Sequence, residues 1–401
     1  MTFAVLLAWT LSVSLTPLAA ALAWKCDAVS KPDGQRKLHQ RPTPLWGGVS
    51  LYLALLAGLA GGHFFAAGPE AGAMLPIALA LSGGVLCLLG AWDDLTELSA
   101  GRKLAGQIMA TLPVVLAGLY VERAELFGYT LQLGWLGIVA TVGWLLLCIN
   151  AMNLIDGMDG LASTVGILIS AAVAVVAGLW GVADVMLASL ALAAALAGFL
   201  VYNRPPARIY LGDSGSMVAG GVLGVLVLRV ATGGTAAPNL TVAAALFFVP
   251  LLDTFLAIVR RSIEGRSLMD ADRGHVHHRL LDHGLGVWRV LGVLGGLCVL
   301  SGVVAALVAA SGQEWLAWAV LPAVAALAVH RRLIGHEEWR LTRQWLAGLG
   351  ARGQGRREPL APPHRLRVVS PPPAGRVREG VLRGHAALGE PAPMESSKSA
   401  A

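Results

Sequence analysis

The sequence predicts an all-α polytopic membrane protein with about eleven transmembrane helices. Three observations predict this class. The chain has 401 residues, of which 56% are hydrophobic and only 13% charged, and its mean hydropathy is +0.67. Such a composition is too apolar for a soluble domain of this length. Long apolar windows recur along the chain, and the polar residues are concentrated in a few segments between them.

Apolar windows with the length of a transmembrane helix define the expected spans. They cover residues 3–24, 47–66, 74–91, 105–121, 134–150, 161–180, 184–202, 216–232, 240–259, 290–310 and 314–331. A cleaved signal peptide is the alternative for the first window. No Lys or Arg precedes that window, however, and its apolar run is long for a signal peptide, so we expect an uncleaved span. Together the windows define a transmembrane domain over residues 1–333.

Lysine and arginine residues predict the orientation of the spans. If the N-terminus faces outward, the inner loops carry nearly all of them: Lys25, Lys31, Arg36, Lys37, Arg41, Arg102, Lys103, Arg204, Arg208, Arg260, Arg261, Arg266, Arg273, Arg279 and Arg289. The outer loops carry only Arg123. By the positive-inside rule this asymmetry predicts a multi-pass membrane protein whose inner loops face the cytoplasm. The net charge of +6 suits anionic membrane lipids and does not require nucleic acid as a partner.

Five polar segments lie between the apolar windows. They are Arg36–Gly48, Asp93–Leu98, Asn150–Ala162, Tyr210–Ser216 and Asp272–Leu281. Ionisable groups near lipid are costly, and they usually mark a functional site. The predicted orientation places all five segments on the cytoplasmic face, so we expect one shared active site there.

Asp93 and Asp94 are adjacent carboxylates at the inner end of an apolar window. Two neighbouring carboxylates repel each other and ionise together most readily beside a cation. Mg²⁺ is suitable because it prefers carboxylate and phosphate oxygens. The alternative is a pair of solvated acids at a helix end, where acids are common.

The segment Asn150–Ala162 has polar residues at a spacing of three, which are Asn150, Asn153, Asp156 and Asp159. If helical turns carry them, they share roughly one face. Its glycines would let the backbone approach a ligand closely. A polar turn between two spans is the alternative, but a turn rarely needs two amides and two acids in register.

The segment Tyr210–Ser216 places Asp213 in a turn of small residues before a span. Backbone N–H groups at the start of that span could face a phosphate, and Asp213 could hold a metal ion that bridges the phosphates. Alternatively, Ser214 or Asp213 is the N-terminal cap of the helix.

The last polar segment contains three histidines and an arginine, His275, His277, His278 and Arg279. Three imidazoles in four residues could bind zinc. Cysteine partners are absent, however, and Arg266 and Arg273 crowd the same loop. Arginine and histidine together favour a diphosphate or sugar hydroxyls as the ligand.

The chain changes character after residue 333. Trp339, Leu341 and Trp345 among arginines indicate a short amphipathic helix on the inner membrane surface. Beyond Gly350, the abundance of Pro, Arg, Gly and Ser predicts a tail without a fold of its own. Residues 334–401 therefore form a second, cytoplasmic region.

In this order, the five segments resemble those of the polyprenyl-phosphate N-acetylhexosamine-1-phosphate transferases. The resemblance is to the WecA- and TagO-like branch of the superfamily that includes the MraY translocase, and it covers about residues 25–285. It implies an eleven-span enzyme that transfers N-acetylhexosamine 1-phosphate from a UDP-sugar to undecaprenyl or another polyprenyl phosphate and releases UMP. N-acetylglucosamine is the expected sugar, and the reaction would initiate synthesis of a cell-envelope polysaccharide. The resemblance leaves a homodimer open.

The resemblance also implies roles for individual residues. Asp93 and Asp94 match the paired aspartates near the lipid phosphate and are the expected catalytic residues. Asp213 matches the aspartate that binds Mg²⁺, or Mn²⁺ in its place, and Asp156 is the expected second metal ligand.

The remaining matches are expected to bind substrate. Asn153, Asp156 and Asp159 match the N-x-x-D-x-x-D run that lines the nucleotide-sugar site. The others are Lys103 near the phosphates, Asn203 and Tyr210 at the uracil pocket, and His275, His277, His278 and Arg279 in the H-x-H-H-R loop of the branch that uses N-acetylglucosamine. One departure is visible, because Leu268 and Met269 replace the Pro-Phe pair usual before that loop.

Two alternative functions stay open at this point. One is the MraY-type transfer of phospho-N-acetylmuramoyl-pentapeptide. The other is transport of sugars or anions, which would place acids at mid-membrane in broken spans, whereas these polar segments lie at the ends of spans. The sequence does not distinguish a one-step transfer from a two-step route through a covalent intermediate.

Overall fold

The computed structural model describes residues 1–31, 41–65, 74–231, 239–267 and 274–330, together with residues 335, 339, 340, 342 and 343. Contacts divide the chain into two units, Met1–Gly350 and Ala351–Ala401. The second unit, which holds the expected tail, lies outside the described residues, as does most of the expected amphipathic helix after residue 333. The predicted domain boundary at residue 333 stays a prediction.

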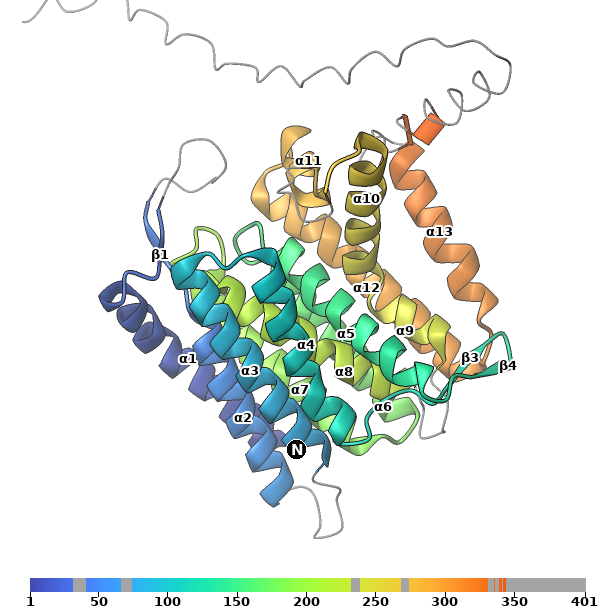
Figure 1. The fold of residues 1–401 in the computed structure, drawn as a ribbon, viewed down its shortest axis with the longest axis horizontal. Coiled ribbons are helices and arrows are strands. Elements are labelled where there is room, and N and C mark those ends of the chain that lie inside the picture. The colour runs from blue at the N-terminus through green and yellow to red at the C-terminus, as the bar shows by residue number, and fades with distance from the viewer. Residues whose placement is uncertain are drawn as a thin grey trace, which may run out of the picture. The chain divides into compact units, whose positions relative to one another are not determined.

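Helices make up nearly all of the described structure (Figure 1). They are α1 (Thr2–Lys25), α2 (Gly47–Phe65), α3 (Met74–Thr96), α4 (Ala100–Leu116), α5 (Leu136–Ile155), α6 (Leu161–Leu179), α7 (Ala183–Asn203), α8 (Gly212–Ala231), α9 (Leu240–Leu246), α10 (Phe248–Glu264), α11 (Val276–Asp282), α12 (Val287–Ser311) and α13 (Trp315–His330). Two pairs of short antiparallel strands accompany them, β1 (Val29–Ser30) with β2 (Thr43–Pro44) and β3 (Arg123–Leu126) with β4 (Tyr129–Gln132).

Every expected span corresponds to a helix or, in one case, to a pair of helices. Within the described residues, 8 helices are long and apolar enough to cross a membrane: α1, α2, α3, α5, α6, α7, α8 and α12. Helices α4 and α13 are shorter, with 17 and 16 residues, and the pair α9–α10 is bent by 84°. The helical, multi-pass membrane fold is confirmed, whereas the number of eleven spans stays a prediction.

The expected span at residues 240–259 is broken into α9 and α10. Phe247 separates the two helices with a φ of −104° and a ψ of 16°. Pro250 lies in the first turn of α10, where its missing N–H removes no helical hydrogen bond. Asn239 caps α9 by accepting a hydrogen bond from Val242 N at 2.9 Å. The break was not predicted because the apolar run continues across it.

Helix α8 is the central helix of the bundle. Its apolar window is 94% buried, and it packs against α2, α3, α5, α6 and α7. Small residues allow this close packing. A Cβ atom at Gly48 would lie 2.1 Å from Gly215 N, and one at Gly90 would lie 2.3 Å from Ser214 N. These two contacts fix the start of α2 and the last turns of α3 against the start of α8.

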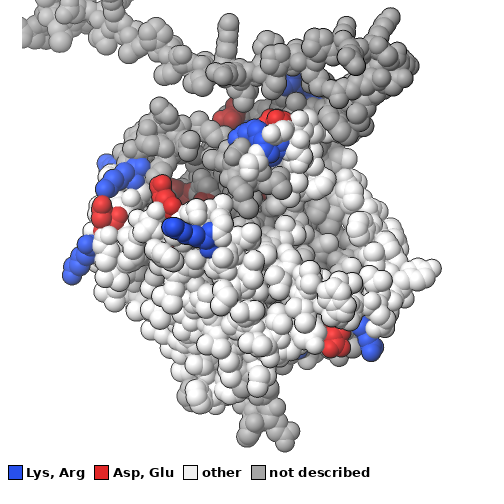
Figure 2. Space-filling model, in the orientation of Figure 1, with Lys and Arg blue, Asp and Glu red and all other residues white. Residues whose placement is uncertain are grey.

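The described parts of the polar segments gather at one end of the bundle. The end of α3, the turn between α5 and α6, the start of α8 and helix α11 all lie there (Figure 1). The β3–β4 hairpin, which was not predicted, lies at the opposite end (Figure 1). Figure 2 shows a flank almost free of charged side chains between these two ends, as expected for a surface that faces lipid.

The close contact at Gly90 predicts a specific sensitivity of the fold. Gly90→Ala should push α3 away from α8, because the added Cβ meets backbone atoms that have no alternative rotamer. Overpacking of this kind costs about 1–3 kcal/mol. The apparent Tm in detergent should fall, and the control Gly143→Ala should not lower it, because a Cβ at Gly143 meets nothing within 4 Å. Equal melting temperatures for the two variants would contradict this packing.

Candidate active site

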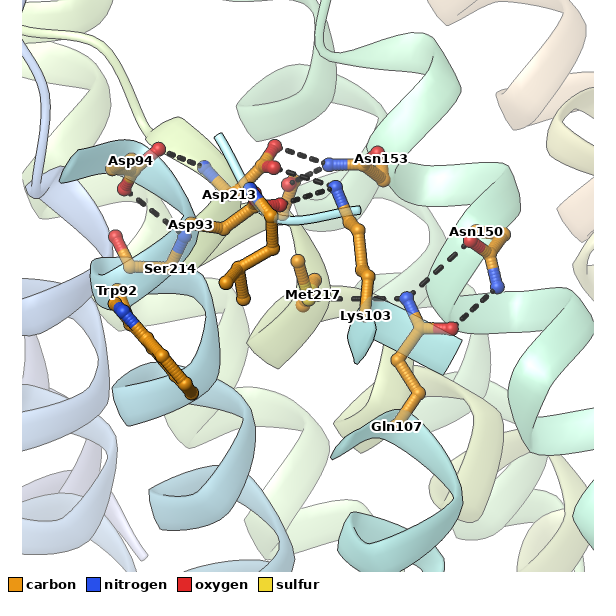
Figure 3. Close-up of polar contacts among 12 residues, drawn as sticks. Trp92, Asp93, Asp94, Lys103, Gln107, Asn150, Asn153, Asp213, Ser214 and Met217 are labelled. Carbon is orange, nitrogen blue, oxygen red and sulfur yellow. Dashed lines mark hydrogen bonds and ion pairs between the residues drawn. The ribbon is translucent and has the colours of Figure 1, made fainter. Parts of the chain in front are cut away.

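A half-buried lysine joins two helices at the polar end of the bundle. Lys103, in the first turns of α4, lies with its Nζ 2.8 Å from Asp93 Oδ2 and 2.6 Å from Asp213 Oδ2 (Figure 3). Asp93 Oδ1 accepts a hydrogen bond from Leu98 N at 2.7 Å, beyond the end of α3. Asp93 is only 7% exposed, so its charge depends on these partners. The structure thus brings together Asp93, Lys103 and Asp213, as the sequence predicted.

Asp94 has a different environment from its neighbour Asp93. Its two carboxylate oxygens accept hydrogen bonds from Asp213 N at 2.8 Å and Ser214 N at 3.3 Å (Figure 3). A carboxylate at this place is favoured by the partial positive charge of the helix N-terminus. The capping group of α8 therefore comes from α3, whereas the alternative left open by the sequence was a cap by Ser214 or Asp213. The Ser214 N–H group, one of those that could have faced a phosphate, is used in this cap.

Gly212 makes the Asp94 cap possible. Its φ is +70°, and a Cβ atom there would lie 2.7 Å from Asp94 Oδ2. A side chain would therefore be strained and would also displace the carboxylate. This contact explains why a glycine directly precedes Asp213.

Asn153, near the end of α5, orients Asp213 from the other side. Its Nδ2 lies 2.6 Å from Asp213 Oδ1 and 2.9 Å from Ser216 Oγ. Both oxygens of Asp213 are therefore engaged, one by an amide and one by an ammonium group (Figure 3). Four helices, α3, α4, α5 and α8, contribute to this network.

A reciprocal pair of amides supports the network one turn deeper in the bundle. Gln107 Nε2 donates to Asn150 Oδ1 at 3.3 Å, and Asn150 Nδ2 donates to Gln107 Oε1 at 2.9 Å. Because Gln107 follows Lys103 by one turn and Asn150 precedes Asn153 by one turn, the pair fixes the register of α4 against α5. Gln107 was not predicted as a site residue, although a glutamine inside an apolar window is a signal for it.

The segment Asn150–Ala162 is not one helical face. Helix α5 ends at Ile155, so Asn150 and Asn153 are helical, whereas Asp156 is the C-terminal cap and Asp159 lies in the turn before α6. Asp159 Oδ2 accepts a hydrogen bond from Ala207 N at 2.8 Å, which holds the segment between α7 and α8. The prediction that the four polar residues share one helical face therefore holds for Asn150 and Asn153 only.

Asp156 is the unsatisfied carboxylate of the site. It makes no side-chain hydrogen bond with any residue that the structure describes. Burial raises its pKa well above the usual range, and the nearby carboxylates of Asp213, Asp94 and Asp159 raise it further. A carboxyl group in such surroundings ionises most readily when a cation is bound beside it.

The oxygen ligands fit Mg²⁺ in their chemistry. Within the described part of the chain, no group of three His, Cys, Asp or Glu side chains converges to hold a metal. Mg²⁺ does not require such a group, because it is commonly held by one or two carboxylates together with substrate phosphates and water. Asp156 and Asp213 supply two carboxylates, and the raised pKa of Asp156 indicates the negative potential that a cation would relieve.

Asn203 and Tyr210 lie beside the turn that carries Asp159. Asn203 is 3% exposed; its Oδ1 accepts from Ser163 Oγ at 2.9 Å, and its Nδ2 donates to Ile209 O at 3.0 Å. Its amide thus holds the segment before α8 in place. Tyr210 is half-buried, and burial together with the Asp159 carboxylate raises the pKa of its hydroxyl to about 12.

The histidines of the last polar segment form a compact group. His275 and His277 stack with ring planes 8° apart and centroids 6.0 Å apart, and the ring of His278 lies 4.2 Å from that of His277. Burial lowers the pKa of His277 to about 3, with a further contribution from His278, so His277 is neutral at physiological pH. Arg279 donates from Nε to Gly274 O at 2.9 Å. Arg273, Leu268 and Met269 lie outside the described residues.

Gly157 is the point where the histidine group meets the carboxylate group. A Cβ atom at Gly157 would lie 2.4 Å from His277 Nε2, so a larger residue there would require His277 to move. The structure therefore places the His275–Arg279 loop, which is expected to bind the donor, directly against the turn that carries Asp156 and Asp159.

The raised pKa of Asp156 predicts that replacing this residue changes the stability of the protein in a pH-dependent way. Asp156→Asn should raise the apparent Tm of the metal-free protein, because an ionised Asp156 destabilises the folded state. The rise in Tm should be absent below about pH 4, where Asp156 is protonated in both the folded and the unfolded wild type. It should grow as the pH rises through the pKa of Asp156 in the folded protein. Melting curves in detergent with a chelator, from about pH 4 to pH 9, measure it.

Asp184→Asn provides the control for this effect. Asp184 is an exposed acid in the first turn of α7, away from the other carboxylates, so its replacement should not reproduce the pH course. An Asp156→Asn variant no more stable than the wild type at any pH would contradict the environment described for Asp156.

Comparison with known proteins identifies the family of the chain. The profile of glycosyl transferase family 4 matches residues 76–231. A protein of Bacillus subtilis named probable undecaprenyl-phosphate N-acetylglucosaminyl 1-phosphate transferase is 31% identical over 273 residues, which are 68% of this chain and 74% of the relative. A decaprenyl-phosphate N-acetylglucosaminephosphotransferase of Mycobacterium tuberculosis is 33% identical over 308 residues, 67% of this chain and 73% of that protein.

A relative with a different name is also similar. The phospho-N-acetylmuramoyl-pentapeptide-transferase of Shouchella clausii is 27% identical over 306 residues, 72% of this chain and 91% of that protein. The two relatives named for N-acetylglucosamine have the higher identity. The resemblance drawn from the five polar segments is therefore confirmed: the chain belongs to glycosyl transferase family 4, among the polyprenyl-phosphate N-acetylhexosamine-1-phosphate transferases.

Proposed function

We propose that the protein transfers N-acetylglucosamine 1-phosphate from UDP-N-acetylglucosamine to undecaprenyl phosphate or a related polyprenyl phosphate and releases UMP. The observation that carries the proposal is the network of Asp93, Lys103, Asn153 and Asp213 at the end of an apolar bundle. A lipid phosphate headgroup lies at this depth of a membrane. The names of the relatives in Bacillus subtilis and Mycobacterium tuberculosis support polyprenyl phosphate as the acceptor.

In the proposed reaction, an oxygen of the acceptor phosphate attacks the β-phosphorus of the donor. The bond from that phosphorus to the bridging oxygen breaks, and UMP leaves with this oxygen. The protein must bring two anions together, and the ammonium group of Lys103 offsets part of their charge. The attacking phosphate oxygen is already anionic, and Asp93, 2.8 Å from that ammonium group, keeps Lys103 in place. A Mg²⁺ ion held by Asp213 and Asp156 would supply charge stabilisation to the phosphates.

We place the site on the cytoplasmic face of the bacterial inner membrane, where the reaction would initiate synthesis of a cell-envelope polysaccharide. The distribution of basic residues supports this placement. Lys25, Arg204, Arg208 and Arg266 lie at the polar end of the bundle with Lys103, whereas Arg123 lies on β3 at the other end.

Donor choice tests the proposal most directly. The purified protein in detergent, with undecaprenyl phosphate and Mg²⁺, should transfer label from UDP-N-acetylglucosamine and not from UDP-N-acetylmuramoyl-pentapeptide. The reason is that the compact group of histidines with Arg279 offers donors for a diphosphate and an acetamido sugar. Preferential use of the muramyl-pentapeptide donor would assign the protein to the translocase activity, and transfer from neither donor would contradict a transferase.

The assigned metal ligand gives a second test. Asp213→Asn should lower kcat/KM by about 100-fold or more, because a charged oxygen ligand is replaced by a neutral amide. Raising the Mg²⁺ concentration should recover little activity, and expression should be normal because Asn retains the volume of Asp. Asp184→Asn serves as the control. Wild-type turnover by Asp213→Asn at ordinary Mg²⁺ would rule out Asp213 as a ligand.

A further inference from the structure

The His275–Arg279 loop, which binds the donor in the proposed function, is attached to α10 through one buried carboxylate. Asp253, 4% exposed, lies with its Oδ2 2.9 Å from His275 Nδ1, and its Oδ1 accepts a hydrogen bond from Val276 N at 2.8 Å. Both oxygens are therefore used to hold two consecutive residues of the loop. Asp253 lies inside an apolar window rather than in a polar segment, so no sequence pattern marks it.

A second contact from the same face of α10 supports this attachment. Asp253, Ala257 and Arg260 are buried and recur at helical spacing, so they face the same side. A Cβ atom at Gly274 would lie 2.3 Å from Arg260 Cζ, so the guanidinium group packs directly on the backbone that leads into the loop. Helix α10 thus contacts the loop at Gly274, His275 and Val276.

The opposite side of the loop faces the donor-site turn. His277 is 2% exposed, its Nε2 has no hydrogen-bond partner within the described residues, and it lies against Gly157. The loop is therefore enclosed between α10 and the turn that carries Asp156 and Asp159. A shift of the loop would move His278 and Arg279 relative to those carboxylates.

The chemistry of Asp253 also determines the state of His275. An ionised carboxylate only accepts hydrogen bonds, so His275 Nδ1 must carry a proton and donate it. The Nε2 atom of His275 is then left as an acceptor in the neutral ring, or as a second donor in the charged ring. An orienting carboxylate of this type commonly fixes both the tautomer and the direction of a functional imidazole.

We propose that Asp253 is a positioning residue for the donor: it acts through His275 to hold the His275–Arg279 loop against the turn between α5 and α6. The inference rests on the proposed function, in which this loop binds the sugar diphosphate. Asp253 itself does not touch the substrate. Its loss should therefore weaken use of the donor and leave use of the acceptor unchanged.

The replacement Asp253→Asn tests this role without changing the size of the side chain. Asn has one acceptor oxygen, so if it keeps the bond from Val276 N it presents its NH₂ group to His275 Nδ1 and forces the other tautomer. We expect kcat/KM for UDP-N-acetylglucosamine to fall about 10–100-fold, chiefly through a higher donor KM, and the KM for undecaprenyl phosphate to change less than about twofold. Asp253→Glu, which retains two acceptor oxygens, should recover part of the loss.

Thr254→Val provides the matched control. Thr254 is the neighbouring residue on α10, it is buried, and its hydroxyl has no hydrogen-bond partner within the described residues. This variant alters the same stretch of helix without removing a contact to the loop, and it should retain wild-type donor and acceptor KM.

A double-mutant cycle with His275→Ala decides whether Asp253 acts through His275. If it does, Asp253→Asn should cause little further loss in the His275→Ala background. Additive losses, or an Asp253→Asn variant indistinguishable from Thr254→Val, would overturn the inference while the active wild type leaves the proposed function intact. A wild-type protein that transfers nothing from the donor would overturn the proposed function, and this inference with it.

Discussion

The contact of the Lys103 ammonium group with Asp93 and Asp213 is the interaction on which the rest of the site depends. Carboxylates at the end of an apolar bundle lose much of their hydration and are costly without a cation. Lys103 satisfies one oxygen of each acid, and neighbouring N–H groups satisfy the others. Removing one charge from this group would leave the others poorly solvated and without a partner, which is destabilising. These contacts therefore hold α3, α4 and α8 in one arrangement.

The scaffold meets this requirement through small residues and buried amides rather than through large side chains. Gly90 and Gly48 allow α3 and α2 to touch the backbone of α8, and Gly212 leaves room for the Asp94 cap. The pair of Gln107 with Asn150 fixes α4 against α5. In lipid, where no hydrophobic force drives helices together, close backbone contact and hydrogen bonds between helices are the main sources of such precision.

The sequence predicted the helices and the residues of the network because both leave a local signal. Apolar windows mark spans, and charged residues at their ends mark the site. Partnerships between distant residues leave no such signal: nothing near Asp94 indicates that it caps α8, and nothing near Asp253 indicates that it binds His275. The break at Phe247 was missed because the apolar run continues across it, although Pro250 is a local signal for it, and the β3–β4 hairpin was missed because it lies in the short stretch between two apolar windows.

The charge of the site explains why it has two parts. Asp93 and Asp213 contact Lys103, and Asp156 lies near the carboxylates of Asp94, Asp159 and Asp213, so this part of the site is rich in acids and would not bind phosphates well by itself. In the proposed reaction, Asp156 and Asp213 would hold a divalent cation, which would offset the charge of the phosphates. The histidine and arginine part needs no metal, since Arg279 is permanently charged. His277 is neutral and buried where the two parts meet at Gly157, so it separates them without adding charge to either. A substrate with a diphosphate and a sugar can contact both parts at once, which is the property that a donor site of this chemistry requires.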